Sequence, residues 1–252
     1  MLFFKRILKE SAAAANPTAP AERRTIPRFA INPQFKLKAV LSFTKRTDTQ
    51  SPKGNTRPGW NWKCRILDCS EQGVRIKMDP ALKVQARDLC DLKLSVEGFE
   101  LTIPCHIANI REEPEGLVFG LKHDIEAEQT WSAYWQLLEV VALGSTLKLH
   151  RRTTKPDETG YLVEQYVNNR PAHLTIWRHP ANQAVAAFEF RLKDNLVRAA
   201  VGQPLACLTG PAGRPATAAQ ALEIQRLFSW VVLNLASAVP DDVREFLKNY
   251  SV

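Results

Sequence analysis

The alternation of apolar and polar residues divides the 252-residue chain into two stretches of strand-like sequence. In residues 35–122, apolar residues recur at every second position in short runs, and turn-forming residues separate these runs. Such a pattern is typical of the short strands of a sandwich or a barrel. The predicted strands are 35–43, 62–67, 74–78, 89–96, 101–110 and 117–122, with a long polar loop at 44–59.

A helix is expected directly after the last of these strands. Its apolar residues are spaced by three and four positions, which places them on one helix face, and Asp124 is the predicted N-cap. This stripe consists of Trp131, Tyr134, Trp135, Leu138 and Val141. We interpret it as a face that packs on the strands rather than as a platform for a ligand.

The rest of the sequence predicts a small α+β domain, for which we recognise no family. Thr217 and Gln220 have the spacing of a capping box ahead of an amphipathic helix. Strands are predicted at 161–167, 173–178, 184–192 and 204–208, and a last short helix at 241–250. The expected divisions are a basic segment with an Ala/Pro linker at 1–22, a domain at 23–143, a connector or opening strand at 144–160, and the α+β domain at 161–252.

The positive charge of the chain is concentrated near its beginning. Residues 1–60 hold twelve Lys and Arg against three Asp and Glu, whereas the remaining residues hold 22 against 23. A local positive field attracts anionic ligands and raises their encounter rate. It fits a small anionic ligand, loose nucleic-acid binding or an acidic membrane surface equally well.

The five cysteines predict reduced thiols rather than a metal site or a disulfide framework. They form an odd set without a Cys-x-x-Cys pair, and several lie in apolar runs where a thiol behaves as a small hydrophobe. The histidines show no ligand spacing either. We therefore expect no metal, no cofactor and a reducing, cytoplasmic setting.

Neither a secretion signal nor a membrane-spanning segment is predicted. The apolar start of the chain is interrupted at Lys5, and the apolar run at 228–239 is too short to span a bilayer. Residues 1–10 are interpreted as a partly ordered terminus, or as a short basic amphipathic helix that touches a membrane or a partner.

A cluster of arginines precedes the first predicted strand. Arg23, Arg24 and Arg28 lie on a stretch that Pro27 keeps out of a helix. Arginine offers a fixed charge, a fork that matches phosphate or guanine O6/N7, and a flat face that stacks on a base. The alternative interpretation of this segment alone is a solvated basic linker.

A second motif, Asp-Cys-Ser-Glu-Gln-Gly at residues 68–73, joins two predicted strands. Asp68 can accept hydrogen bonds from guanine N–H groups, and the Ser70 hydroxyl can bridge to a phosphate. Gly73 permits a positive φ and lets a ligand approach the backbone closely. Alone, the motif would be read as an ordinary hairpin turn. Together, the two motifs favour a guanine nucleotide with phosphates, bound without chemistry.

The pattern Arg24-x-x-x-Arg28 ahead of a small barrel, followed by Asp68-x-Ser70-x-x-Gly73 between two strands, resembles a PilZ domain over residues 20–143. This resemblance implies a six-stranded antiparallel β-barrel with a C-terminal helix, so the predicted fold class is α+β: this barrel followed by the small α+β domain. It also implies a bacterial signal-transduction receptor for cyclic dimeric GMP, whose ligand contacts Arg24, Arg28 and the turn, with Arg23 as an additional contact. The spacing between the motifs is longer than usual for the family, because of the loop at 44–59.

The mechanism expected from this resemblance is an ordering of the arginine segment over the ligand, with an output delivered through the C-terminal domain and a protein partner. Two alternatives remain open at this level: a PilZ-like module that recruits a protein without the ligand, and weak nucleic-acid binding through residues 1–60. Catalysis is not expected. His173, His179, Glu164 and Glu189 are scattered, and the chain contains no nucleophile motif, metal spacing or Walker-type loop.

Overall fold

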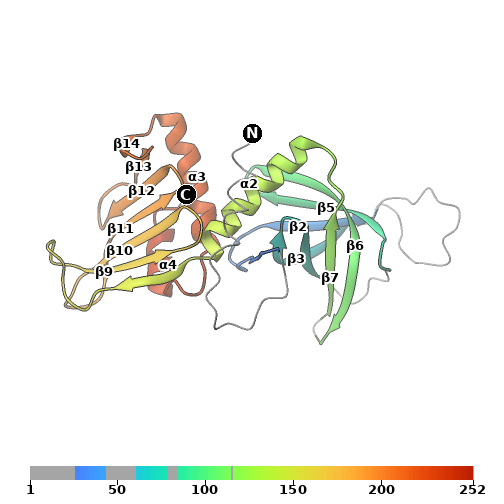
Figure 1. Cartoon of the computed structure of the whole chain (residues 1–252), viewed down its shortest axis with the longest axis horizontal. Helices are drawn as coiled ribbons and strands as arrows, with labels where there is room; N and C mark the ends of the chain where they lie inside the picture. Colours follow the sequence, from blue (N-terminus) through green and yellow to red (C-terminus); the bar gives the residue numbers. More distant parts are fainter. Residues whose placement is uncertain (1–25, 44–60, 79–83, 115, 252) are drawn as a thin grey trace, which may run out of the picture. The chain divides into compact units, whose positions relative to one another are not determined.

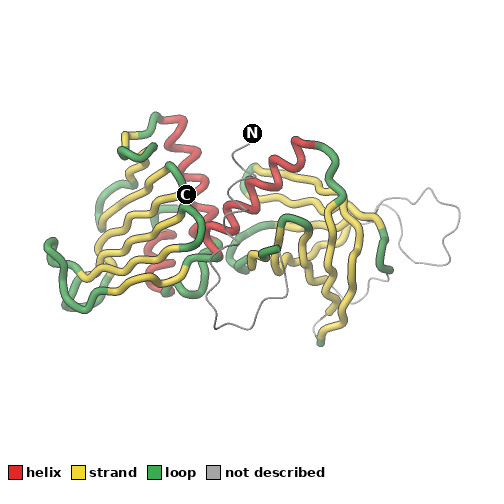
Figure 2. Tube along the Cα trace, viewed as in Figure 1, coloured by secondary structure: helices red, strands yellow, loops and turns green. Residues whose placement is uncertain are grey.

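The computed structural model describes residues 26–43, 61–78, 84–114 and 116–251. These residues divide into two compact units, which cover 26–142 and 143–251. Each unit has its own antiparallel sheet and few helices (Figures 1 and 2).

The N-terminal unit is built on a closed barrel. The strands follow the order β3-β2-β5-β6-β7-β4, and the pairing of β4 with β3 closes the circle. The predicted six-stranded antiparallel barrel is thereby confirmed. A short additional strand, β1, pairs with β3 and was not predicted. The strands are β1 (Arg28–Ala30), β2 (Lys38–Phe43), β3 (Asn61–Ser70), β4 (Gly73–Met78), β5 (Leu89–Val96), β6 (Phe99–Glu113) and β7 (Gly116–His123).

The core of the barrel is formed by the inward-facing residues of these strands. Because successive side chains of a strand point to opposite faces, every second side chain of each strand points into the barrel, and these are the apolar ones. Burying each large apolar side chain contributes about 1.5–3 kcal/mol. Fully buried members of this core are Leu41, Ile76, Leu92, Ile103, Ile107 and Phe119.

The helix α2 (Glu128–Ser145) follows the last barrel strand and begins later than predicted. Asp124 is not its N-cap, because the helix starts four residues further on. The Asp124 carboxylate instead pairs with Nδ1 of His106 on β6, at 2.8 Å. The aromatic stripe does face the protein, as predicted: Tyr134 is only 1% exposed.

The C-terminal unit is an antiparallel sheet in which each strand pairs with its neighbour in sequence. Two helices, α3 (Ala218–Leu233) and α4 (Asp241–Lys248), lie on one face of this sheet (Figure 1). The rings of Phe188 and Phe228 stack there with centroids 5.6 Å apart. The strands are β8 (Lys148–Arg152), β9 (Leu162–Val167), β10 (Ala172–Arg178), β11 (Val185–Leu192), β12 (Asn195–Ala200), β13 (Ala206–Thr209) and β14 (Arg214–Pro215).

The helices of this unit are as predicted. The Thr217 side chain accepts a hydrogen bond from the Gln220 amide, and Gln220 accepts one in return from the Thr217 amide, which makes the capping box. The small α+β architecture is confirmed, whereas β12 and β14 were not predicted.

Candidate functional site

The end of β3 is flanked by a different strand on each side, and this arrangement assembles the site. Residues 61–64 of β3 pair with β2, but its last residues pair with β4 on one edge and with β1 on the other. In this register Arg28 lies opposite Ser70, and Arg75 lies opposite Asp68. The two sequence motifs are therefore adjacent in space, although about forty residues separate them.

A bulge in β3 decides which way the acidic side chain points. Ile66 pairs with Ile76, but Asp68 pairs with Arg75, so β3 contains one residue more than β4 between these two pairs. The extra residue is Leu67, whose carbonyl accepts a hydrogen bond from the Ile31 amide. Bulges of this kind re-aim side chains. Here the bulge puts Asp68 and Arg75 on the face opposite the core-facing apolar residues.

The Asp68 carboxylate is held between two guanidinium groups. Its Oδ1 atom lies 3.2 Å from Nη1 of Arg28, and its Oδ2 atom lies 2.5 Å from Nη2 of Arg75. The aspartate side chain is only 9% exposed, whereas the two arginine side chains are 37% and 41% exposed. The carboxylate therefore lies deep in the site, and the cations reach the surface.

The turn between β3 and β4 is fixed by its own polar groups. The Ser70 hydroxyl donates to the Gly73 carbonyl oxygen at 3.1 Å, within the hairpin. Gly73 does not use the positive φ that glycine permits, because it is not among the positive-φ glycines of the described residues. Glycine is required there for space: a Cβ atom would lie 2.1 Å from the Leu121 carbonyl oxygen of β7. A close approach of β7, rather than a backbone conformation, explains the residue.

Helix α2 supports this turn from inside the protein. The Tyr134 hydroxyl donates to the Ser70 carbonyl oxygen at 2.7 Å, and both residues are buried. The His123 ring lies edge-on to the Tyr134 ring, with centroids 4.4 Å apart. Burial lowers the pKa of His123 to about 4, so its imidazole is neutral near pH 7. The motif turn therefore rests on a buried aromatic cluster without charge.

The structure brings Arg28, Asp68, Ser70 and Gly73 together at one end of the barrel. Arg23 and Arg24 lie outside the described residues. Arg75 was missed by the sequence analysis, because it belongs to neither motif. The alternation in β4 could have revealed it: Val74, Ile76 and Met78 are buried, so Arg75 must point outward beside the motif.

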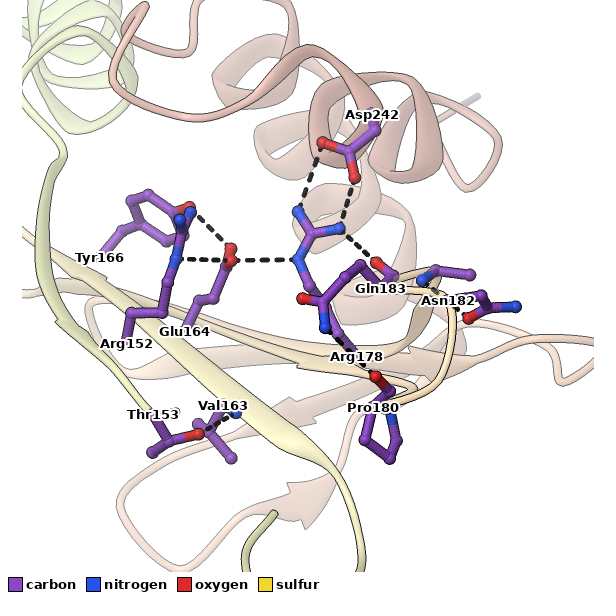
Figure 3. A network of polar contacts seen from close by, with 11 residues as sticks. Arg152, Thr153, Val163, Glu164, Tyr166, Arg178, Pro180, Asn182, Gln183 and Asp242 are labelled. Atoms are coloured by element: carbon purple, nitrogen blue, oxygen red, sulfur yellow. Dashed lines mark hydrogen bonds and ion pairs between the residues drawn. The ribbon is translucent and has the colours of Figure 1, made fainter. Parts of the chain in front are cut away.

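A second cluster of charged residues lies in the C-terminal unit (Figure 3). Glu164 is 3% exposed, and its Oε1 atom lies 2.9 Å from Nε of Arg152 and 3.1 Å from Nε of Arg178. The Tyr166 hydroxyl donates to its other oxygen, and Arg178 also pairs with Asp242 of α4. Because both arginines and a tyrosine occupy its carboxylate, Glu164 links β8, β9 and β10 rather than offering a free acid or base, and Arg178 extends this network to α4 through Asp242.

Within the described ranges, no group of three or more His, Cys, Asp or Glu residues is placed to hold a metal ion. No described helix is long and apolar enough to cross a bilayer.

The arrangement defines a class of protein, the small antiparallel barrel with a cationic site at the end of one strand pair. Comparison with known proteins identifies the family. The PilZ domain model matches residues 22–139, so this part of the chain is a PilZ domain. PilZ domains are ligand-binding modules and form a family of receptors for cyclic dimeric GMP.

Among solved structures, the chain is similar to the PilZ domain with c-di-GMP of YcgR from Escherichia coli. The two share 12% sequence identity with a TM-score of 0.35, and the match covers 46% of this chain and 89% of that chain. No curated protein matches the chain.

Proposed function

We propose that this protein is a receptor for cyclic dimeric GMP, which binds at the end of β3 between the arginine segment and the Asp68–Gly73 turn. The observation that carries the proposal is the contact between the motifs: the Arg28 guanidinium lies 3.2 Å from the Asp68 carboxylate. The contact places a guanidinium group and a carboxylate acceptor on the same face of the barrel. The turn next to them is held from inside the protein by the Tyr134 hydroxyl.

The chemistry of the ligand matches these groups. Cyclic dimeric GMP carries two phosphodiesters and two guanines, so it requires cations, stacking surfaces and acceptors for guanine N–H groups. Charge-assisted hydrogen bonds contribute roughly 1.5–3 kcal/mol each, and stacking of a guanidinium on a desolvated ring adds about 2 kcal/mol. A few such contacts suffice for micromolar affinity, about −8 kcal/mol, after the cost of ordering is subtracted.

In this proposal the segment ahead of β1 closes over the bound dinucleotide through Arg23 and Arg24, while Arg28 is already held by the pairing of β1 with β3. The ordering of that segment is the signal, and the C-terminal unit delivers it to a protein partner. We place the receptor in a reducing, cytoplasmic compartment, since all five cysteines are free thiols.

The test is a calorimetric titration of the full chain with cyclic dimeric GMP. We expect binding by the wild type and its loss in Arg28→Ala and in Arg24→Ala. Arg65→Ala is the matched control, because this exposed arginine lies on the same strand as Asp68 and outside the site. Wild-type affinity in both motif variants would overturn the proposal. Absence of heat with the wild type, together with capture of a protein partner, would favour an interaction module instead.

A further inference from the structure

We propose that Arg75 is a further arginine of the ligand site, which contacts the anionic ligand directly and adds a positive charge to the site. This inference rests on the proposed function, and it adds a residue that lies in neither motif. The first observation is its position: Arg75 stands directly opposite Asp68 in the pairing of β3 with β4.

Arg75 changes the charge balance of the part of the site that the structure describes. Asp68 carries one negative charge and Arg28 one positive charge, so these two groups alone are neutral. Arg75 raises the sum to one positive charge, which an anionic ligand can neutralise. Each oxygen of the carboxylate contacts a different arginine, so neither cation displaces the other.

The geometry places the two cations on either side of β3. Because neighbouring strands lie about 4.8 Å apart, β1 and β4 are separated by roughly 10 Å across β3. Arg28 and Arg75 project from these two strands on the face that carries Asp68. The two guanidinium groups converge on the two oxygens of the Asp68 carboxylate, so they can bind neighbouring groups of one ligand, such as a phosphate and a guanine.

The Arg75 guanidinium also keeps capacity for further contacts. Asp68 engages it through Nη2, its side chain is 41% exposed, and its buried Nε atom has no hydrogen-bond partner among the described residues. Asp68 therefore acts as a positioning residue, which orients both guanidinium groups while their remaining donors stay available. A purely structural ion pair would affect stability without affecting ligand affinity.

The experiment compares Arg75→Ala and Arg75→Gln with Arg65→Gln, each titrated as the full chain with cyclic dimeric GMP at low and at high salt. Gln keeps a hydrogen-bonding side chain beside Asp68 but removes the charge. We expect both Arg75 variants to bind about ten- to hundredfold more weakly than the wild type, the effect of one lost charge-assisted contact. Their affinity should also depend less steeply on salt. Arg65→Gln should bind like the wild type.

The outcomes separate the two proposals. If the wild type does not bind, the proposed function fails. If the wild type binds, Arg28→Ala does not, and Arg75→Gln matches Arg65→Gln, only the assignment of Arg75 is overturned. Thermal unfolding of each variant checks the barrel. If Arg75→Ala does not fold, Arg75→Gln decides the question, because it keeps a polar, hydrogen-bonding side chain beside Asp68.

Discussion

Removing the Tyr134 hydroxyl tests whether helix α2 holds the motif turn in place. In Tyr134→Phe the ring still fills its buried position, but the Ser70 carbonyl loses the donor that lies 2.7 Å away. Leaving a buried acceptor unsatisfied costs about 1–3 kcal/mol. For a unit of this size, we expect the melting temperature to fall by about 4 °C per kcal/mol, or about 4–12 °C in all.

The assay is hydrogen exchange resolved along the chain, combined with thermal unfolding. Exchange in Tyr134→Phe should rise in the β3–β4 hairpin, where the turn has lost its support. The matched control is Tyr250→Phe, since the Tyr250 hydroxyl donates to the Ala200 carbonyl at 2.9 Å in the other unit. That variant should destabilise the C-terminal unit and leave the hairpin unchanged. Wild-type exchange in the hairpin of Tyr134→Phe would refute the argument that this hydrogen bond holds the turn.

Three further variants test other features. Gly73→Ala should destabilise the barrel by at least about 1–3 kcal/mol in denaturant titrations, because its Cβ atom would meet the Leu121 carbonyl; unchanged stability would contradict the close approach. The pKa of His123 is about 4 in the folded state and about 6.5 in the unfolded state, so the unfolded state takes up the imidazole proton at higher pH as the solution is acidified. The free energy of unfolding should therefore be unaffected by this group above about pH 6.5 and fall by about 3 kcal/mol towards pH 4. His123→Phe should flatten this decline, and an identical pH profile would assign the decline to other groups. Glu164→Gln should cost the C-terminal unit about 1.5–3 kcal/mol by removing one of the two carboxylates that pair with buried Arg178, while the barrel melts as before; equal loss in both units would exclude a local role.

The barrel could be predicted from the sequence because its strands alternate regularly. The predicted strand at 89–96 coincides with β5, and β4 and β7 differ from prediction by only one or two residues at their ends. The strand β1 could not be predicted, since three residues, Arg28 to Ala30, carry too little periodicity to distinguish a strand from an extended linker. Its formation depends on a free edge of β3, which is a property of the folded barrel.

The candidate site was predicted in part. The arginine segment and the Asp68–Gly73 turn were expected to lie together around a ligand, and the structure places Arg28 beside Asp68. The hydrogen-bond partners of individual polar residues were harder to predict. The Ser70 hydroxyl is engaged with Gly73, and Asp124 binds His106 instead of capping a helix. Local sequence shows which residues favour turns and caps, but the partner that satisfies each polar group is set by contacts distant in the chain.

The extra residue in β3 has a consequence for protein engineering. On a regular strand that continued the alternation from Ile66, Asp68 would point into the hydrophobic interior, where an ionised carboxylate costs several kcal/mol. A designer who copied residues 62–73 onto another barrel would therefore have to copy the irregular backbone at Leu67 as well. The motif therefore consists of its sequence together with the β-bulge at Leu67. An alignment that assumed a regular strand without the bulge would place the Asp68 side chain on the wrong face of the sheet.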